Sequence, residues 1–553
     1  MQGLMQDVPL TLQMLLERAD ALYPSKTIAT KREDGVHRQT YAQTVDRVAR
    51  LAAALQAAGV KPGDRVATFG WNSSRHLELY LAVPCMGAVL HTLNIRLHPT
   101  QIAYIANHAE DQTVFVDASV AALWQQVRGL NTVRRVVVMD DLTPEGRPGM
   151  SAESAIPGAD DYEAFLETGG TAFRWPKLDE NQAAAMCYTS GTTGHPKGVV
   201  YAHRSSLLHS MGVLFADTLA LSERDTALVI VPQFHANAWG MPYAAVLTGA
   251  DLVLPSRFTD PASIASVVAS EQVTMSAAVP TIWFGVLQAI RGGEIDPAAL
   301  ASLERIVVGG SAVPEALMRG YDELGIRILH AWGMTETSPL GTVARVKTTV
   351  PEEQALRIRL TQGLPTPTLR VRIVTEDGSV APWDGKTMGE LQISGPWIAD
   401  AYYEPEAPDQ RGGHDRFADD DGTRWLKTGD VAVIDHEGYV QLVDRTKDLV
   451  KSGGEWISTL ELENLLAAHA GVVEAAVIAV PHPKWDERPL ACVVSRDPDL
   501  TSGQLCAYLA EHLAKWQVPD DVVFIDEVPK TSVGKFDKKA LRERYREYRL
   551  PDT

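Results

Sequence analysis

Along most of the chain, segments with the hydrophobic period of a helix alternate with short apolar runs. The helical period is clearest between Thr40 and Gly59, where apolar side chains recur every three or four residues. Thr40 and Gln43 have the spacing of a capping box, and Gly59 is suited to end a helix. We therefore predict a helix between these signals. Its buried face consists of Val45, Val48, Leu51, Ala52 and Leu55.

Short runs rich in Val, Ile, Leu and Phe follow such helical stretches. These runs cover residues 66–69, 113–116, 228–231 and 305–308, and a helical stretch over residues 101–107 precedes the second. Runs of this kind predict strands buried on both faces, as in parallel sheets covered by helices. The pattern predicts an α/β fold for most of the chain, and no repeat of fixed period interrupts it.

The pattern changes near Gly363. Residues 369–374 and 389–393 alternate apolar and polar positions, which predicts a small β subdomain. After Lys447 we expect a compact tail with a helix capped by Ser458, a strand over 473–480, a helix over 503–513 and a strand over 522–525. The chain is therefore predicted to form two domains, residues 1–445 and residues 446–553.

The charge balance argues against some classes of partner. Lys and Arg total 51 against 70 Asp and Glu in 553 residues, which gives a formal net charge of −19. An acidic excess of this size disfavours nucleic acid and anionic membrane surfaces. We therefore expect the partners to be small molecules.

Cysteine usage and hydropathy bear on the compartment. The four cysteines are too scattered for a metal knuckle and too few for a disulfide framework, which favours a reducing cytoplasm. The first residues contain no basic stretch followed by an apolar run, so no secretory signal is expected. The longest apolar stretch, residues 80–90, is interrupted by Pro84 and Gly87 and is too short to span a bilayer.

A run of small residues carries the strongest chemical signal. It reads Tyr188-Thr189-Ser190-Gly191-Thr192-Thr193-Gly194-His195-Pro196-Lys197-Gly198. Glycines let backbone N–H groups approach an anion, hydroxyls add donors, and Lys197 adds a positive charge, so the run is suited to cradle a phosphate. A surface turn of similar composition is the alternative. The run lacks the G-x-x-x-x-G-K-[ST] pattern of a Walker A loop.

This run resembles the phosphate-binding loop of the adenylate-forming superfamily, which includes the acyl-CoA synthetases. Further segments resemble the superfamily's motifs in the same order, namely residues 232–235, 332–337, 428–430, 444–445 and 529–535. The resemblance covers essentially the whole chain. It implies a large N-terminal domain with two parallel-sheet αβαβα subdomains and a small β subdomain, followed by a small, mobile α+β C-terminal domain.

The same resemblance implies an enzyme that activates a carboxylic acid with ATP and Mg²⁺. Lys535, Glu336 and Thr189 are implied as catalytic residues, with Glu336 and Thr189 holding the metal on the ATP phosphates. Asp430 would bind the ribose, and Arg445 would contact the same nucleotide. The other implied ATP-binding residues are Thr189, Ser190, Gly191, Thr192, Thr193, Gly194, Lys197, Gly310, Ser311, Ala331, Trp332, Gly333, Met334, Thr335 and Lys535.

Outside the motif series, each of these side chains has an ordinary explanation. Glu336, Asp430 and Arg445 would be solvated charges, since Asp, Glu and Arg are mostly exposed in proteins. Lys535 would be one cation in a basic tail that also contains Lys530. Only the order of the motifs favours the functional roles.

The implied acyl-binding residues are His235, Trp239, Gly309 and Gly333. In the superfamily's peptide synthetases a carboxylate at the position of His235 pairs with the substrate's ammonium group. An ammonium left unpaired in a buried pocket is costly, so an amino acid substrate is disfavoured. The segment around Trp239 resembles that of fatty acyl-CoA synthetases, in which the indole gates an apolar tunnel. Ordinary core packing is the alternative for Trp239.

For the acceptor, a glycine-rich segment resembles the loop that lies beside the pantetheine arm of CoA. Its residues are Lys451, Ser452, Gly453, Gly454 and Trp456. Lys447 occupies the position at which the resemblance places a hinge, and the alternative is a solvated lysine in a charged run. We expect the acceptor to be a free thiol, coenzyme A.

These observations predict an acid–CoA ligase of the medium- to long-chain fatty acid type. A ligase for a short alkylthio acid or an aryl acid is the alternative within the fold, and a nucleotide-binding protein without turnover is the alternative outside it. The apolar residues 10–16 are expected to pack against a second subunit in a homodimer.

Overall fold

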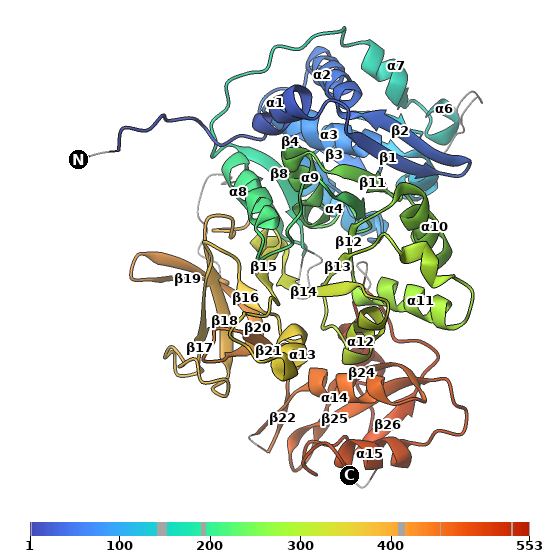
Figure 1. The fold of residues 1–553 in the computed structure, drawn as a ribbon, viewed down its shortest axis with the longest axis vertical. Helices are drawn as coiled ribbons and strands as arrows, with labels where there is room; N and C mark the ends of the chain where they lie inside the picture. The colour runs from blue at the N-terminus through green and yellow to red at the C-terminus, as the bar shows by residue number, and fades with distance from the viewer. Residues whose placement is uncertain are drawn as a thin grey trace.

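The computed structural model describes residues 1, 3–140, 152–189, 195–406, 415–453, 455–531 and 535–551, without the side chains of residues 153 and 154. The predicted phosphate-binding residues 190–194 and Gly454 lie outside the described residues. Figure 1 shows two large sheets with their helices in the upper and central parts of the view, a β subdomain at the left and a small domain below.

One sheet has seven strands in the order β7-β6-β5-β3-β4-β8-β9 and is parallel except for the pair β8 and β9. Its strands are β3 Arg65–Phe69, β4 Val89–Thr92, β5 Thr113–Asp117, β6 Arg135–Met139, β7 Asp160–Asp161, β8 Ala183–Tyr188 and β9 Gly198–Ala202. The helical segments of this region are α2 Tyr41–Ala57, α3 Ser74–Cys85, α4 Pro99–His108, η1 Ala118–Val120, α5 Ala121–Trp124, α6 Ala152–Ala155 and α7 Tyr162–Glu167.

The other large sheet has nine strands in the order β16-β15-β14-β13-β12-β10-β11-β1-β2, with a parallel centre and antiparallel edges. Its strands are β1 Thr27–Arg32, β2 Gly35–Thr40, β10 Thr226–Val229, β11 Asp251–Leu254, β12 Met275–Ala278, β13 Arg305–Gly309, β14 Arg327–Gly333, β15 Leu340–Val343 and β16 Leu364–Pro365. The helical segments are α1 Gln13–Leu22, α8 His203–Leu214, η2 Ala236–Gly240, α9 Met241–Thr248, α10 Pro261–Glu271, α11 Pro280–Arg291, η3 Pro297–Leu300, α12 Glu315–Glu323, η4 Thr335–Thr337 and α13 Glu352–Leu360.

The β subdomain is an antiparallel sheet of five strands in which β20 pairs with β18, β19 and β21. Its strands are β17 Arg370–Val374, β18 Gly389–Ser394, β19 Phe417–Asp420, β20 Thr423–Ile434 and β21 Val440–Arg445. Because β21 ends at Arg445, this sheet leads directly into the small domain.

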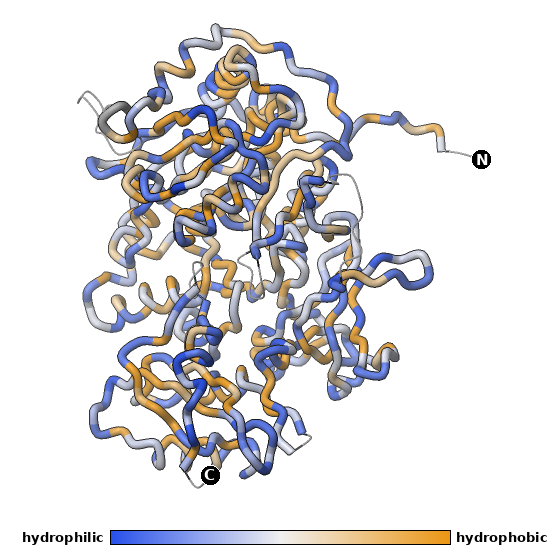
Figure 2. Tube along the Cα trace, turned by 180° about the vertical axis from the view of Figure 1, so that it is seen from behind, coloured by the Kyte–Doolittle hydropathy of each residue, from blue (hydrophilic) through white to orange (hydrophobic). Residues whose placement is uncertain are grey.

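The small domain is built on a second five-stranded sheet, in which β24 and β25 form a long hairpin and β26 pairs in parallel with β25. Its elements are β22 Val450–Ser452, β23 Glu455–Ile457, α14 Thr459–Ala468, β24 Val472–His482, β25 Asp486–Ser495, α15 Ser502–Ala510, β26 Asp521–Phe524 and α16 Lys538–Arg544. Two apolar clusters in this domain contain only residues between Val450 and Leu550. Figure 2 shows apolar segments running through the inside of this domain and of the larger sheets.

The predicted fold class is confirmed, and the hydrophobic period is the reason. The capping box at Thr40 and Gln43 forms at the start of α2, with the Gln43 N–H donating to the Thr40 hydroxyl at 3.2 Å. All residues of β5 are buried, as expected for a strand covered on both faces. Ser458 caps α14 by accepting the Glu461 N–H at 3.1 Å. The domain boundary after Arg445 stays a prediction.

One prediction about the surface is wrong. Leu12 and Leu15 are fully buried within the chain itself, and α1 packs against α9 and α2. Residues 10–16 therefore belong to the protein's own core and offer no free apolar face for a second subunit. None of the described helices combines the length and the hydropathy that a membrane-spanning helix requires.

Candidate active site

The site lies where β13 and β14 end side by side. Parallel strands present their carboxyl ends at one edge of a sheet, which is the usual place for a ligand in α/β proteins. Gly309 ends β13 and pairs with Ala331 of β14. A Cβ atom on Gly309 would lie 2.6 Å from the carbonyl oxygen of Ala331, so only glycine fits here. Gly310 follows with φ +86°, a conformation that favours glycine.

The other predicted nucleotide residues follow these two strands. Trp332 is buried, Gly333 and Met334 are half-buried, and Thr335 is buried at the start of η4. Ser311 is exposed just after Gly310. The strand ends therefore bring these predicted residues to one edge of the sheet.

Asp430 links this edge to the β subdomain. Its Oδ2 atom accepts a hydrogen bond from Trp332 Nε1 at 3.0 Å, and its Oδ1 atom lies 3.3 Å from Arg445 Nε. Asp430 and Arg445 are direct neighbours on β20 and β21. Trp332 fixes one carboxylate oxygen and Arg445 the other, so the carboxylate is held in one orientation beside the strand ends.

Glu336 is a buried carboxylate, 5 % exposed, on the short turn η4. The Tyr402 hydroxyl donates to its Oε1 atom at 2.6 Å. The Tyr201 hydroxyl donates to the carbonyl oxygen of Thr335 at 2.8 Å, which holds the turn from the other side. The Lys197 ammonium lies 4.7 Å from the centre of the Tyr402 ring. Tyr402 therefore connects the predicted metal ligand with the lysine of the phosphate loop.

The two ends of the predicted phosphate-binding run, Thr189 and Lys197, are joined to each other. The Thr189 N–H donates to the carbonyl oxygen of Lys197 at 2.9 Å, and the Lys197 N–H donates to the Thr189 hydroxyl at 3.3 Å. These bonds close the base of the loop, while residues 190–194 between them lie outside the described residues.

Lys535 of the small domain reaches this edge. A Cβ atom built on Gly310 would lie 3.6 Å from Lys535 Cε and 3.9 Å from Trp239 Cζ2. Burial and the charge of Arg445 lower the pKa of Lys535 to about 8, against the opposing effects of Asp430 and Glu336. The geometry therefore places a cation between the predicted nucleotide residues and the predicted acyl residues.

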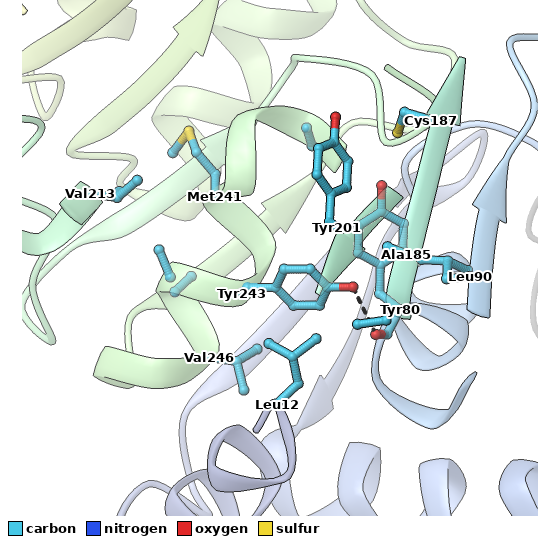
Figure 3. Close-up of a cluster of buried hydrophobic side chains, with 14 of the residues drawn as sticks. Leu12, Tyr80, Leu90, Ala185, Cys187, Tyr201, Val213, Met241, Tyr243 and Val246 are labelled. Atoms are coloured by element: carbon cyan, nitrogen blue, oxygen red, sulfur yellow. Dashed lines mark hydrogen bonds between the residues drawn. The ribbon is translucent and has the colours of Figure 1, made fainter. Parts of the chain in front are cut away.

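The segment before Trp239 has an unusual backbone. Four non-glycine residues and one glycine have consecutive positive φ angles: Ala236 41°, Asn237 50°, Ala238 51°, Trp239 56° and Gly240 72°. Such a left-handed turn is costly for L-residues and persists only where surrounding structure holds it. The Cys187 thiol donates to the Asn237 side-chain oxygen at 3.0 Å. Figure 3 shows the buried cluster around Cys187, where Tyr80, Tyr201 and Tyr243 lie together.

His235 precedes this turn and carries no charge near neutral pH. Burial and the positive charges of Lys535 and Arg96 lower its pKa to about 3. A neutral imidazole at this position provides no anion for an ammonium group. The environment of His235 therefore agrees with a substrate that carries only a carboxylate.

The described residues fit a metal ion that arrives with its nucleotide. They contain no group of three or more His, Cys, Asp or Glu side chains arranged to hold a metal ion. Mg²⁺ needs no such group, because it commonly binds one or two carboxylates together with substrate phosphates and water. Glu336 supplies one buried carboxylate, and Tyr402 occupies only its Oε1 atom among the described contacts.

The predicted CoA loop lies in the small domain, on the hairpin of β22 and β23. Lys451 Nζ lies 5.1 Å from the centre of the Trp456 ring, and the Ser452 hydroxyl accepts from Arg488 at 3.1 Å. Gly453 has φ +61° and donates its N–H to the carbonyl oxygen of Trp485 at 2.8 Å. All of these contacts stay within the small domain, whereas Lys535 of the same domain lies at the strand ends of the large domain.

The predicted hinge residue, Lys447, is exposed in the connector between the two domains. Thr446 donates its N–H to the carbonyl oxygen of Gly429 at 3.1 Å, and Asp448 donates its N–H to that of Arg445 at 2.8 Å. Lys447 therefore lies between one residue held by the β subdomain and another held by the turn after β21.

Sequence reasoning missed three side chains of the site. Tyr402 and Tyr201 hold the turn that contains Glu336, and Arg96 is close enough to His235 to affect its pKa. Arg96 also lies 5.7 Å from the centre of the Trp71 ring and 5.8 Å from that of Phe234. A tyrosine distant in the sequence from the group it contacts leaves no local signal, so only the fold identifies these residues.

Comparison with known families agrees with this geometry. Residues 16–403 match the family model described as AMP-binding enzyme, and residues 461–535 match the model described as AMP-binding enzyme C-terminal domain. The chain belongs to this family of adenylate-forming enzymes.

Individual relatives narrow the class. A long-chain-fatty-acid–CoA ligase of Thermus thermophilus is 46% identical over 550 residues, which cover 98% of this chain and 97% of the relative. A 3-methylmercaptopropionyl-CoA ligase of Ruegeria pomeroyi is 42% identical over 554 residues, covering 99% of each chain. The ATP-bound structure of MatB from Rhodopseudomonas palustris has a TM-score of 0.80 at 27% identity, covering 98% of this chain and 99% of the other. The predicted membership in the adenylate-forming superfamily, with an acyl-CoA synthetase type of chain, is confirmed.

The pKa of Lys535 predicts a pH dependence. Below about pH 8 the ammonium is protonated and can stabilise a developing phosphoryl charge, and above it the charge is lost. We expect kcat/KM for ATP, measured as pyrophosphate release, to fall as the pH rises through about 8. Lys535→Arg keeps its charge across this range and should remove the fall. A parent profile without this step would contradict the assignment.

Glu336 and Tyr402 provide a matched pair of variants. Glu336→Gln removes the charge of the implied metal ligand and is expected to lower kcat/KM for Mg²⁺-ATP by about 10². Tyr402→Phe keeps the carboxylate and removes only its hydrogen bond, so we expect a loss of about tenfold. Titration of pyrophosphate release with Mg²⁺ measures both. Equal Mg²⁺ dependence in Glu336→Gln and the parent would exclude the metal role.

Proposed function

We propose that this protein is an ATP-dependent acid–CoA ligase that acts on a medium- to long-chain fatty acid. The position of Lys535 is the observation that supports this most strongly. The side chain comes from the small domain, yet it lies beside Gly310 and Trp239 and is influenced by the charges of Asp430 and Glu336. A cation at that point faces both the nucleotide and the acid.

In the first half-reaction a carboxylate oxygen of the acid attacks the α-phosphorus of ATP. The new O–P bond forms as the bond to pyrophosphate breaks, which leaves an acyl-adenylate. Lys535 stabilises the negative charge that gathers on the phosphoryl oxygens, and Asp430 accepts hydrogen bonds from the ribose hydroxyls. Bound Mg²⁺ would neutralise charge on the departing phosphates, with Glu336 and Thr189 as its protein ligands.

In the second half-reaction the sulfur of CoA attacks the acyl carbonyl carbon as its thiol proton passes to solvent, and AMP leaves with the electrons of the acyl–oxygen bond. The loop formed by Lys451, Ser452, Gly453, Gly454 and Trp456 would face the pantetheine arm. Lys535 and this loop belong to one small domain, and Lys535 occupies the strand ends in the described arrangement. A rotation of the small domain at Lys447 would move Lys535 away from the strand ends and bring this loop to them.

Two observations bear on the acid. The uncharged His235 gives no partner for an ammonium group, which favours a simple carboxylic acid. The relative from Thermus thermophilus supports a fatty acid, and it is more similar to this chain than the relative named for 3-methylmercaptopropionyl-CoA. A short alkylthio acid stays the second candidate for this reason, followed by an aryl acid.

The compartment and the oligomer are further parts of the proposal. The four cysteines are free thiols, which supports a reducing cytoplasm. The interface of a homodimer would be formed by residues 1–8, ahead of α1, where Leu4 and Met5 are 91% and 87% exposed. Removing residues 1–8 should convert a dimer to a monomer in light scattering, and an unchanged mass would exclude this interface.

A panel of acids tests the substrate. AMP release with CoA present should be greatest for medium- or long-chain fatty acids in the parent, compared with acetate, methylthiopropionate and benzoate. Trp239→Ala removes the indole beside Gly310, so the chain-length profile should change more than KM for ATP does. Relative kcat/KM values across the panel measure this.

Tyr321→Phe removes the buried hydrogen bond from the Tyr321 hydroxyl to the Trp283 carbonyl oxygen at 2.9 Å, and it serves as the control for a loss of stability elsewhere in the protein. An unchanged profile in Trp239→Ala, with only a lower Tm, would assign Trp239 to core packing. Absence of pyrophosphate release with every acid would instead indicate a nucleotide-binding protein without turnover.

The hinge predicts a separation of the two half-reactions. Proline at position 447 fixes φ near −65° and restricts Thr446, so it should hold the arrangement in which Lys535 lies at the strand ends. We expect Lys447→Pro to release pyrophosphate at near-parent rates in a single turnover and to lose thioester formation from acyl-adenylate by at least about 10².

Lys447→Ala is the matched control, because it removes the same charge without restricting the backbone. Parent-like rates of Lys447→Pro in both half-reactions would exclude a hinge at this residue. Equal losses in both would indicate a folding defect, which circular dichroism of the purified variant detects.

A further inference from the structure

A polar cavity lies away from the strand ends of the candidate active site. Its volume is about 440 Å³, within the range of small-molecule sites. It is formed by β1 and β2, α2, the start of α3, and α7, which Figure 1 shows in the upper part of the molecule. The lining residues are Arg32, His37, Arg38, Gln39, Gln43, Asp46, Arg47, Ser74, Arg75 and Glu163.

Most arginines of this cavity already have acidic partners. Arg47 donates two hydrogen bonds to Glu163, at 2.8 and 2.9 Å, and its Nε donates to Glu78 at 2.7 Å. Arg75 Nε donates to the same Glu163 carboxylate at 2.9 Å, and Arg38 donates to Glu271 at 2.6 Å. Although burial raises the pKa of Glu163, Arg47 and Arg75 hold it at about 2. These arginine and glutamate side chains therefore neutralise one another.

Arg32 is the exception. It ends β1 and is only 7% exposed, yet its Nε has no hydrogen-bond partner. Within the described part of the chain no carboxylate forms an ion pair with it. Burying an N–H donor without a hydrogen-bond partner is costly, because the protein removes its water without replacing it, and the Nε atom of Arg32 is such a donor. The small exposed part of Arg32 faces the cavity that it lines.

The start of α3 adds partial positive charge, although two of its first N–H groups are already bonded, Ser74 to the Thr30 hydroxyl at 3.1 Å and His76 to the Ser73 hydroxyl at 3.2 Å. Ser74 and Arg75 are the first residues of this helix of 12 residues, and both line the cavity. The N-terminus of a helix carries a partial positive charge, and anions bind there readily. Arg32 and the helix end therefore add positive charge to a cavity whose lining also contains the carboxylates of Asp46 and Glu163.

We propose that this cavity binds an organic oxyanion, with Arg32 as its principal ligand. A guanidinium fork matches the paired oxygens of a carboxylate or a phosphate, and either group would remove the cost of the unpaired charge. The volume of the cavity exceeds that of a lone phosphate, which leaves room for the organic part of the molecule. None of the residues assigned to ATP, acid or CoA lines this cavity, so the site is additional to the active site.

Calorimetric titration of the whole protein tests the site, with inorganic phosphate in one arm and citrate in the other at constant ionic strength. Arg32→Met removes the charge at similar length and should weaken binding by about tenfold or more. Lys31→Gln changes the neighbouring cation on the same strand, outside the cavity lining, and should bind like the parent. Lys535→Ala should also bind like the parent, because it alters only the active site.

Binding of phosphate alone assigns a phosphate group to the ligand, and binding of citrate alone assigns a carboxylate. In the absence of ligand, Arg32→Met should have a Tm equal to or above that of the parent, since it removes an unpaired buried charge. If Arg32→Met fails to fold, Arg38→Gln, at a half-exposed side chain, should weaken the same binding severalfold. No binding of either anion, or equal binding in the parent and the cavity variants, would overturn the proposal.

Discussion

The carboxylate of Asp430 ties the nine-stranded sheet to the β subdomain, and the predicted nucleotide residues lie beside this link. Trp332, one residue before the end of β14, donates to it at 3.0 Å, and Arg445 at the end of β21 lies 3.3 Å away. The residue before Arg445 contacts the small domain: Asp444 accepts the N–H of Thr459, the first residue of α14, at 2.6 Å. The path of the chain into the small domain therefore begins beside the predicted nucleotide residues.

This arrangement brings Lys535 and Arg445 together where the proposed nucleotide would bind. Arg445 and burial both disfavour the charged form of Lys535, which is why its pKa falls to about 8. The phosphates of ATP would supply the compensating negative charge when they bind. In the free site the charged form of Lys535 is therefore disfavoured, and bound phosphates would stabilise it. Charged groups that are already in position need no reorganisation during the reaction.

Hydrophobic periodicity predicted the sheets and helices well because each element buries one kind of face. It could not predict which surface a face would meet, and residues 10–16 illustrate the limit. Their apolar pattern is the same whether the partner is α9 of the same chain or a second subunit. The motif series singled out Glu336, but the Tyr402 hydroxyl that holds it comes from a segment with no comparable signal.

The left-handed turn before Trp239 shows how tertiary structure can override a local preference. Four non-glycine residues in this conformation cost about 1–2 kcal/mol each, and only Asn237 and Gly240 in the segment tolerate it readily. Ala236 and Ala238 are buried, and Cys187 holds Asn237, so the surrounding core fixes the backbone. A backbone fixed in this way cannot move with the substrate. In the proposed acyl site, adjustment to the acid would therefore come from rotation of the Trp239 side chain, which is only partly buried at the edge of this core.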